Sequence, residues 1–293
     1  MIPKVNQLIE DFDRLGYVVE EELATVLLLT LDLNKPILLE GPPGVGKTEA
    51  AHILASLKDT ELIRLQCYEG LDASSAIYEW NYQKQLLAIK LTEHDDLSTS
   101  EKEAHIFSED FLMKRPLLKA ITSEKQPVLL IDEIDRADEE FEAFLLELLS
   151  DFQISIPELG TIKAKHRPIV ILTSNRTREL SDALKRRCLY HWIHYPSFQK
   201  ELSILRKRVP EFEQDLAVLL VRFVHYLREM KLQKSPGIAE TLDWANGLLA
   251  LQFKSFSEED IEKTLGCILK SDPDINLVKK EGIQTILEEI GAV

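Results

Sequence analysis

One octapeptide, Gly41-Pro42-Pro43-Gly44-Val45-Gly46-Lys47-Thr48, restricts the possible folds of this chain more than any other feature. It lies between an apolar run at 36–39, typical of a buried strand, and a stretch at 48–57 that is typical of a helix. Glycines in such a loop let backbone N–H groups surround a polyphosphate beside the positive end of the helix dipole. The pattern therefore predicts a nucleotide-binding loop. Lys47 would reach the β- and γ-phosphates and the Thr48 hydroxyl would ligate Mg²⁺, and the predicted nucleotide contacts extend to Glu49.

Apolar runs alternate with helix-like stretches along the first two thirds of the chain. Four further runs bounded by turn residues lie at 61–65, 127–131, 168–173 and 189–193. This alternation indicates βαβ units, so we expect an α/β fold with a five-stranded parallel sheet flanked by helices. After Pro196 helical spacing dominates. We therefore expect a nucleotide-binding domain over residues 1–196 and an all-helical lid domain over residues 197–293.

Two stretches interrupt the alternation. The segment 67–115 is long and carries an aromatic cluster of Tyr78, Trp80 and Tyr82. Insertions of this length are usually functional or disordered, and the aromatic residues favour order. A small separate hydrophobic cluster is the simpler interpretation. The segment 153–163 alternates apolar and polar residues and turns at 158–160, which predicts a β-hairpin.

Two carboxylates follow the apolar run 128–131. Strands of a parallel sheet end at one edge, so Asp132 and Glu133 are expected near the phosphate-binding loop. Asp132 would hold Mg²⁺ through its water shell, and Glu133 would orient and deprotonate the water that attacks the γ-phosphate. Acidic pairs at strand ends are often only solvated turns. The catalytic interpretation of Asp132 and Glu133 therefore depends on the presence of the phosphate-binding loop in the same chain.

Further polar residues follow the next run. Asn175 ends the predicted strand that neighbours the Asp132 strand, where its amide could contact the attacking water or the γ-phosphate. It could equally be a turn residue. Downstream, Lys185, Arg186 and Arg187 end a helical stretch. They either complement the helix dipole or direct an arginine at the nucleotide of a neighbouring subunit.

The order of these parts resembles the AAA+ ATPases, and within them the MoxR group. The resemblance implies that Gly41–Thr48 is Walker A, Leu129–Glu133 is Walker B and Asn175 is sensor 1. It also implies that Arg187 is the arginine finger, with Arg186 as the competing candidate.

A narrower resemblance joins three stretches, Arg64–Asp72, Tyr78–Tyr82 and Thr173–Leu180, to the CoxD-like ATPases of carbon monoxide dehydrogenase maturation. In the MoxR group the positions of 67–115 and 153–163 correspond to the helix-2 insert and the pre-sensor-1 hairpin. The resemblance implies ATP and Mg²⁺ as cofactors and a homo-oligomeric ring, expected to be a hexamer. It further implies a von Willebrand factor A-domain partner and a metalloenzyme client of the molybdenum-hydroxylase type.

One position departs from the MoxR pattern. MoxR-type lids usually carry a sensor-2 arginine after Ser-Pro, whereas this chain reads Ser235-Pro236-Gly237. Helical spacing covers residues 238–252, and we interpret the segment before it as a helix start at which Gly237 could act as a cap, with Ser235 as N-cap and Pro236 at the first helical position.

Composition excludes some classes of function. The net charge of −15 argues against broad electrostatic binding of nucleic acid or anionic membranes. Cys67, Cys188 and Cys267 are widely spaced, which fits neither a disulfide framework nor a zinc site and suggests the reducing cytoplasm. Two alternatives to an ATP-hydrolysing remodeller stay open at this point. These are a nucleic-acid-associated AAA+ motor and a nucleotide switch with negligible turnover.

Overall fold

The structure, a computed structural model, describes residues 2–91, 98–157, 159–253 and 255–291. Parts of three predictions lie outside these residues: positions 92–97 of the insert, Glu158 in the hairpin turn, and residues 254, 292 and 293 of the lid. Backbone contacts divide the chain into two compact units. One comprises Met1–Glu21, Gly41–Ala50 and Ile193–Val293, and the other comprises Glu22–Glu40 and Ala51–Trp192. We call them the loop unit and the sheet unit.

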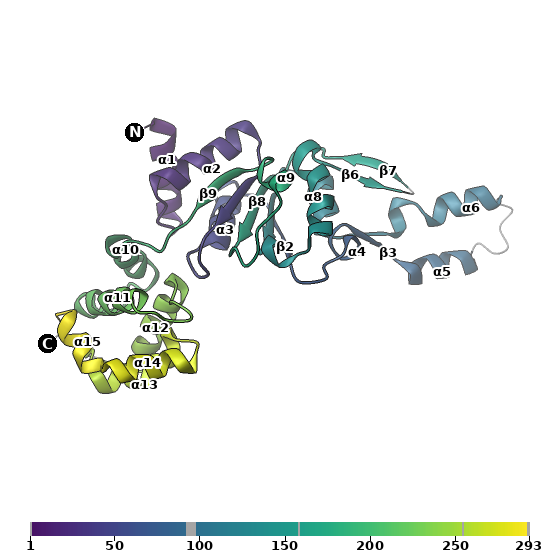
Figure 1. Ribbon diagram of the computed structural model, residues 1–293. Helices are drawn as coiled ribbons and strands as arrows, with labels where there is room; N and C mark the ends of the chain where they lie inside the picture. The colour runs from purple at the N-terminus through teal and green to yellow at the C-terminus, as the bar shows by residue number, and fades with distance from the viewer. Residues whose placement is uncertain (1, 92–97, 158, 254, 292–293) are drawn as a thin grey trace. The chain divides into compact units, whose positions relative to one another are not determined.

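The sheet unit is built on a five-stranded sheet in which every strand pair is parallel (Figure 1). The strand order is β2-β5-β8-β1-β9. This confirms the predicted fold class. The strands coincide with the five apolar runs: β1 (Ile37–Glu40), β2 (Leu62–Gln66), β5 (Val128–Asp132), β8 (Ile169–Ser174) and β9 (Leu189–Trp192).

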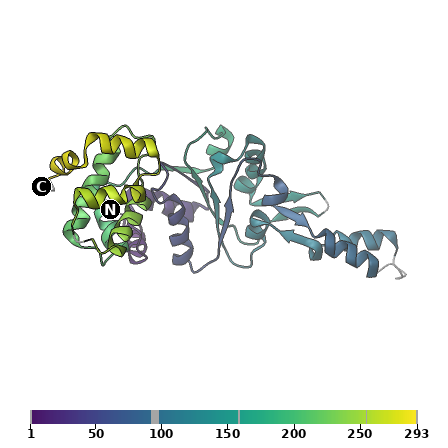
Figure 2. The same ribbon diagram turned by 90° about the horizontal axis from the view of Figure 1, so that it is seen from below.

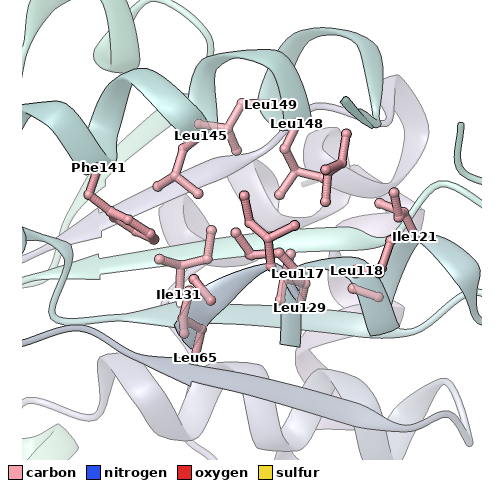
Figure 3. Packing of buried hydrophobic residues seen from close by; sticks show 14 of the residues in the cluster. Leu65, Leu117, Leu118, Ile121, Leu129, Ile131, Phe141, Leu145, Leu148 and Leu149 are labelled. Carbon is pink, nitrogen blue, oxygen red and sulfur yellow. The ribbon is translucent and has the colours of Figure 1, made fainter. Parts of the chain in front are cut away.

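Both faces of this sheet are buried. On one face, Leu65 of β2 and Leu129 and Ile131 of β5 pack against helices α7 (Pro116–Thr122) and α8 (Glu139–Asp151), as Figure 3 shows. The central strands β1, β5 and β8 are buried at every position, including the residues that point to the opposite face. A parallel sheet covered on both sides explains why these strands read as continuous apolar runs. The other helices of the sheet are α2 (Glu21–Leu33), α3 (Lys47–Leu57), which runs from one unit into the other, and α9 (Asp182–Lys185).

The described residues of the long insertion form a substructure of the sheet unit. Strands β3 (Tyr78–Trp80) and β4 (Leu112–Lys114) pair antiparallel, and the Trp80 ring meets Phe107 edge to face at 5.5 Å. Between the strands lie α5 (Tyr82–Leu91) and α6 (Thr99–Ile106), side by side and extending away from the sheet (Figures 1 and 2). The remaining elements of this unit are α4 (Ala73–Ala76), η1 (Glu109–Phe111), η2 (Ile134–Arg136) and the antiparallel hairpin of β6 (Gln153–Ile156) and β7 (Gly160–Lys163).

The loop unit contains the phosphate-binding loop and a helical region. Its core is centred on Trp244, whose ring contacts Phe223 at 5.5 Å and Phe256 at 5.4 Å between centroids. None of the helices in the described parts of the chain is long and apolar enough to cross a bilayer. The helices are α1 (Pro3–Arg14), α10 (Phe198–Arg208), α11 (Gln214–Glu229), α12 (Ile238–Ala250), α13 (Glu258–Ile268), α14 (Asp272–Glu281) and α15 (Ile283–Glu289).

The predicted helix from residue 238 and the cap at Gly237 are confirmed, but the N-cap role of Ser235 and the helical position of Pro236 are wrong. The helix begins at Ile238 with Gly237 as N-cap, so Ser235 is not the cap and Pro236 is not in the first turn. The Gly237 N–H donates to Glu240 Oε2 at 2.9 Å. Just before α12, Arg228 Nε donates to the Pro236 carbonyl at 2.8 Å, a contact that local sequence does not reveal.

Candidate functional site

The glycines of the phosphate-binding loop are required by its backbone. Gly44 and Gly46 have φ of +75° and +89°, in the left-handed region that side chains disfavour. A Cβ at Gly41 would lie 2.3 Å from the Ile193 carbonyl oxygen. The loop therefore takes a turn that only this spacing of glycines allows, and it leads directly into α3 at Lys47.

Lys47 brings a buried positive charge into this loop. Its side chain is 7% exposed, and Nζ donates to the carbonyls of Gly41 and Pro42, both at 2.7 Å. An ammonium group held inside a glycine loop at a helix start suits the oxygens of a polyphosphate. These residues therefore fit a nucleotide.

Two side chains, those of Tyr17 and Glu49, interact within the unit that contains the loop. Tyr17 was not predicted from the sequence. The Tyr17 hydroxyl donates to the Gly46 carbonyl at 3.3 Å, and burial, helped by Glu49, raises the pKa of Tyr17. Glu49, a predicted nucleotide contact, forms an ion pair with Arg208 of α10. The sequence around Tyr17 does not indicate this contact, because its partner, the Gly46 carbonyl, lies in a distant segment of the chain.

At the end of β5, Asp132 is buried, and both of its carboxylate oxygens accept hydrogen bonds. The Thr173 hydroxyl donates to Asp132 Oδ1 at 2.5 Å, and Arg64 donates to Oδ2 from Nε at 3.0 Å and from Nη2 at 2.5 Å. Thr173 and Arg64 come from the strands on either side, β8 and β2. Arg64 was not predicted to act here; the signal is the polar residue alternating with Ile63 and Leu65 near a strand end.

Glu133 is fixed through both its backbone and its carboxylate. Its φ and ψ of 54° and 50° are left-handed, and its N–H donates to Thr173 Oγ1 at 2.9 Å. The carboxylate accepts from Gln66 Nε2 at 3.0 Å and Asn175 Nδ2 at 3.3 Å, and it pairs with Arg136 Nε at 2.9 Å. The structure thus places Asn175 beside Glu133, two residues that the sequence assigned to neighbouring strands.

Asp135, a further residue that sequence reasoning missed, anchors the segment around Asn175. It is buried in η2 (Ile134–Arg136) and accepts from the backbone N–H groups of Asn175 at 3.2 Å and Thr177 at 2.8 Å. Burial and the charges of Asp132 and Asp135 raise the pKa of the Cys67 thiol to about 12. A raised pKa keeps the Cys67 thiol protonated at neutral pH.

The two finger candidates differ in their surroundings. Arg187 Nε donates to Ser150 Oγ at 2.6 Å, and its Nη1 donates to the Ala183 carbonyl at 2.8 Å. Arg186 is exposed, and its side chain forms no hydrogen bond or ion pair with any residue that the structure describes.

The oxygen donors predicted for the metal are of the kind Mg²⁺ prefers. Thr48 offers a hydroxyl in the first turn of α3, and Asp132 offers a carboxylate at the end of β5. Within the described ranges no group of three or more His, Cys, Asp or Glu side chains is placed to hold a metal. Mg²⁺ in nucleotide enzymes typically takes one or two carboxylates together with substrate phosphates, which agrees with this donor set.

Comparison with known proteins places this geometry in a family. The model described as "ATPase family associated with various cellular activities (AAA)" matches residues 37–194. Uncharacterized proteins of Staphylococcus aureus, from strain bovine RF122 / ET3-1 and strain USA300, are 31% identical over 206 residues, which covers 64% of this chain and 70% of theirs. A point mutant of Thermotoga maritima RuvB is 18% identical with a TM-score of 0.51, over 99% of this chain and 86% of its own. A second RuvB mutant is 19% identical with a TM-score of 0.50, over 99% and 85%. At this identity the RuvB likeness shows the fold.

Proposed function

We propose that this chain, which belongs to the family of ATPases associated with various cellular activities (AAA), binds ATP with Mg²⁺ and hydrolyses it. The observation that carries the proposal is the environment of Glu133, a carboxylate held by Asn175 and Gln66 at the end of β5. Strands β5, β8 and β1 are parallel neighbours, so their carboxyl ends share one edge of the sheet. The phosphate-binding loop is the direct continuation of β1.

The residues divide the reaction between them. Lys47 and the loop N–H groups would hold the β- and γ-phosphates, and Thr48 and Asp132 would hold Mg²⁺, which would supply positive charge to the phosphates. Glu133 accepts a proton from water as the water oxygen bonds to the γ-phosphorus and the bond to the leaving oxygen of ADP breaks. Asn175 orients Glu133 and the water. An arginine from a neighbouring subunit, Arg187 or Arg186, stabilises the charge of the transition state.

The finer part of the proposal is a MoxR-type remodeller of the CoxD-like kind, acting in the cytoplasm. It would form a homo-oligomeric ring, a hexamer, and work with a von Willebrand factor A-domain protein on a molybdenum-hydroxylase-type client. Residues 1–196 would be the nucleotide-binding domain and residues 197–293 the lid. Support comes from the resemblance of Arg64–Asp72, Tyr78–Tyr82 and Thr173–Leu180, together with the ordered insert and hairpin.

Nucleotide binding is tested by Lys47→Ala, measured by calorimetric titration with Mg-ATP. We expect binding to weaken at least about a hundredfold, because the change removes the cation from the phosphates. Lys58→Ala is the matched control, since Lys58 is exposed one residue after the end of α3. Absence of Mg-ATP binding by the unmodified protein would overturn the proposal. Co-purification of the chain with a co-expressed von Willebrand factor A-domain protein and its metalloenzyme tests the partner.

A further inference from the structure

The start of α12 lies directly on the phosphate-binding loop, within the loop unit. A Cβ built on Gly237 would stand 2.8 Å from Gly44 Cα and 2.9 Å from the Pro43 carbonyl oxygen. These are backbone atoms, which cannot move aside as the end of a side chain can. The Ile238 N–H donates to the Gly44 carbonyl at 3.0 Å, so a free N–H of the first turn of α12 is satisfied by the loop.

This contact orients one peptide group of the loop. In a trans peptide the carbonyl and the N–H of the same plane point in opposite directions. The Gly44 carbonyl points out toward Ile238, so the Val45 N–H of the same peptide points away from α12. Loops of this kind hold phosphate through such N–H groups. The backbone contact therefore sets the direction of a donor in the loop.

The segment that makes the contact, residues 235–237, is held by side chains that bind its carbonyl groups. Arg228 Nε donates to the Pro236 carbonyl at 2.8 Å, and the Thr241 hydroxyl shares its one proton between Glu201 Oε1 at 2.7 Å and the Gly237 carbonyl at 3.1 Å. The Tyr195 hydroxyl donates to the Ser235 carbonyl at 3.4 Å, and the Arg228 guanidinium lies 4.9 Å from the centre of the Tyr195 ring. Consecutive carbonyls before α12 are thus bound by three different side chains.

A buried carboxylate fixes these side chains in turn. Glu201 is 0% exposed and accepts from Arg228 Nη1 at 2.5 Å, Arg228 Nη2 at 2.8 Å and Thr241 Oγ1 at 2.7 Å. His225 Nε2 lies 3.0 Å from Glu201 Oε2. Burial by itself raises the pKa of Glu201, but the hydrogen bonds from His225 and Arg228 outweigh it and the pKa is lowered. A buried charge with this many partners makes a rigid support.

We propose that Gly237 is a positioning residue for the phosphate-binding loop, held in place by Arg228 and Thr241. The C-terminal helical region would thereby be linked to the nucleotide through a main-chain contact with Gly44, in place of a charged side chain. An arginine at position 237 would break the contact, because its Cβ has no room. The inference rests on the proposed nucleotide binding and adds a route by which helical region and loop affect each other.

The test compares Gly237→Ala with Gly266→Ala. Gly266 lies in α13 of the same unit, where an added Cβ meets no atom within 4 Å. For Gly237→Ala we expect Mg-ATP affinity by calorimetry to fall about tenfold or more, the scale of a lost hydrogen bond plus strain. Amide hydrogen exchange of the nucleotide-free protein should rise in peptides that cover 44–48 and 238–240. Gly266→Ala should match the unmodified protein in both.

Two further variants separate the contact from general damage. Thr241→Val keeps the shape of the side chain and removes the hydroxyl that lies between Glu201 and the Gly237 carbonyl, so we expect an affinity loss of about threefold. Gly237→Arg should bind no better than Gly237→Ala, although it supplies a cation. If Gly237→Ala does not fold, the positioning role is tested by the Mg-ATP affinity of Thr241→Val and by its amide exchange in peptides 44–48 and 238–240.

Each outcome has a definite meaning. Unchanged affinity in Gly237→Ala, with or without faster exchange, overturns the positioning role, as does tighter binding by Gly237→Arg. If the unmodified protein binds no Mg-ATP, the proposed function fails. The contact itself is then still judged by the exchange of peptides 44–48 and 238–240, which requires no nucleotide.

Discussion

Glu133 has a strained backbone conformation that its neighbours hold in place. A non-glycine residue in the left-handed region costs roughly 1–3 kcal/mol and persists only where its surroundings hold it. Here the Thr173 hydroxyl accepts from the Glu133 N–H and donates to Asp132, so one side chain of β8 fixes both acids. The carboxylate accepts from Gln66 and Asn175. Backbone strain of this kind is found most often at functional sites.

At this residue the decisive substitution is Glu133→Gln. The amide keeps the size of the side chain but cannot accept a proton from water, so we expect Mg-ATP binding to persist while hydrolysis falls about 10²- to 10⁴-fold. Phosphate release and calorimetry measure the two quantities. Glu140→Gln, an exposed position in the first turn of α8, is the control and should hydrolyse ATP normally. Equal rates for Glu133→Gln and the unmodified protein would remove Glu133 from the mechanism.

Elements of the sheet were predictable because each strand is a continuous apolar run bounded by turn residues. The adjacency of β5 and β8, and with it the approach of Asn175 to Glu133, followed from the order of motifs. The pairing of Arg64 with Asp132 did not, because it depends on the register in which Gln66 lies opposite Asp132, 66 residues apart in the chain. Helices α1, α14 and α15 were also missed. At the start of α12, Ser235 was wrongly taken as the N-cap; the helix is capped at Gly237, whose N–H donates to Glu240.

An ion pair between Arg178 and the buried Glu142 connects helix α8 to the segment between β8 and α9. Glu142 of α8 is 1% exposed, pairs with Arg178 Nη1 at 2.5 Å and accepts from the Ser181 N–H at 2.9 Å. Arg178→Met leaves this carboxylate without its charge partner, so we expect the free energy of unfolding to drop by about 3 kcal/mol. Urea denaturation measures it. Arg176→Met is the control, because Arg176 is exposed and its ion pair with Glu179 spans 3.8 Å, which predicts a loss below about 1 kcal/mol. Similar losses in both variants would contradict this role of Glu142.

For the molecule as a whole, the net charge of −15 bears on the choice of partner. Binding to duplex DNA draws most of its non-specific affinity from counterion release by basic residues. We therefore expect no binding to random duplex tighter than about 10 μM near physiological salt, measured by fluorescence anisotropy. Sub-micromolar binding that weakens steeply as salt rises would favour the nucleic-acid-associated motor over the remodeller.

Assembly is the other property of the whole molecule, and it depends on which arginine reaches a neighbouring subunit. Arg187 is bonded to two neutral oxygens, of Ser150 and Ala183, which the charged γ-phosphate of a neighbour would outcompete. We expect Arg187→Ala to bind Mg-ATP normally and to hydrolyse it about 10³-fold more slowly. Arg187→Lys should also be impaired, because an ammonium group lacks the planar fork of a guanidinium.

Mixing experiments show whether the arginine acts between subunits. A protomer with Arg187→Ala still has an intact phosphate-binding loop, and a Lys47→Ala neighbour still supplies an intact arginine. The mixture should therefore hydrolyse ATP faster than either variant alone, as measured by phosphate release. If Arg186→Ala shows the defect instead, the finger is the exposed Arg186 and the ring model stands. Activity strictly proportional to protein concentration down to monomer, with no loss in either arginine variant, would exclude action between subunits, because each chain would then complete its own site.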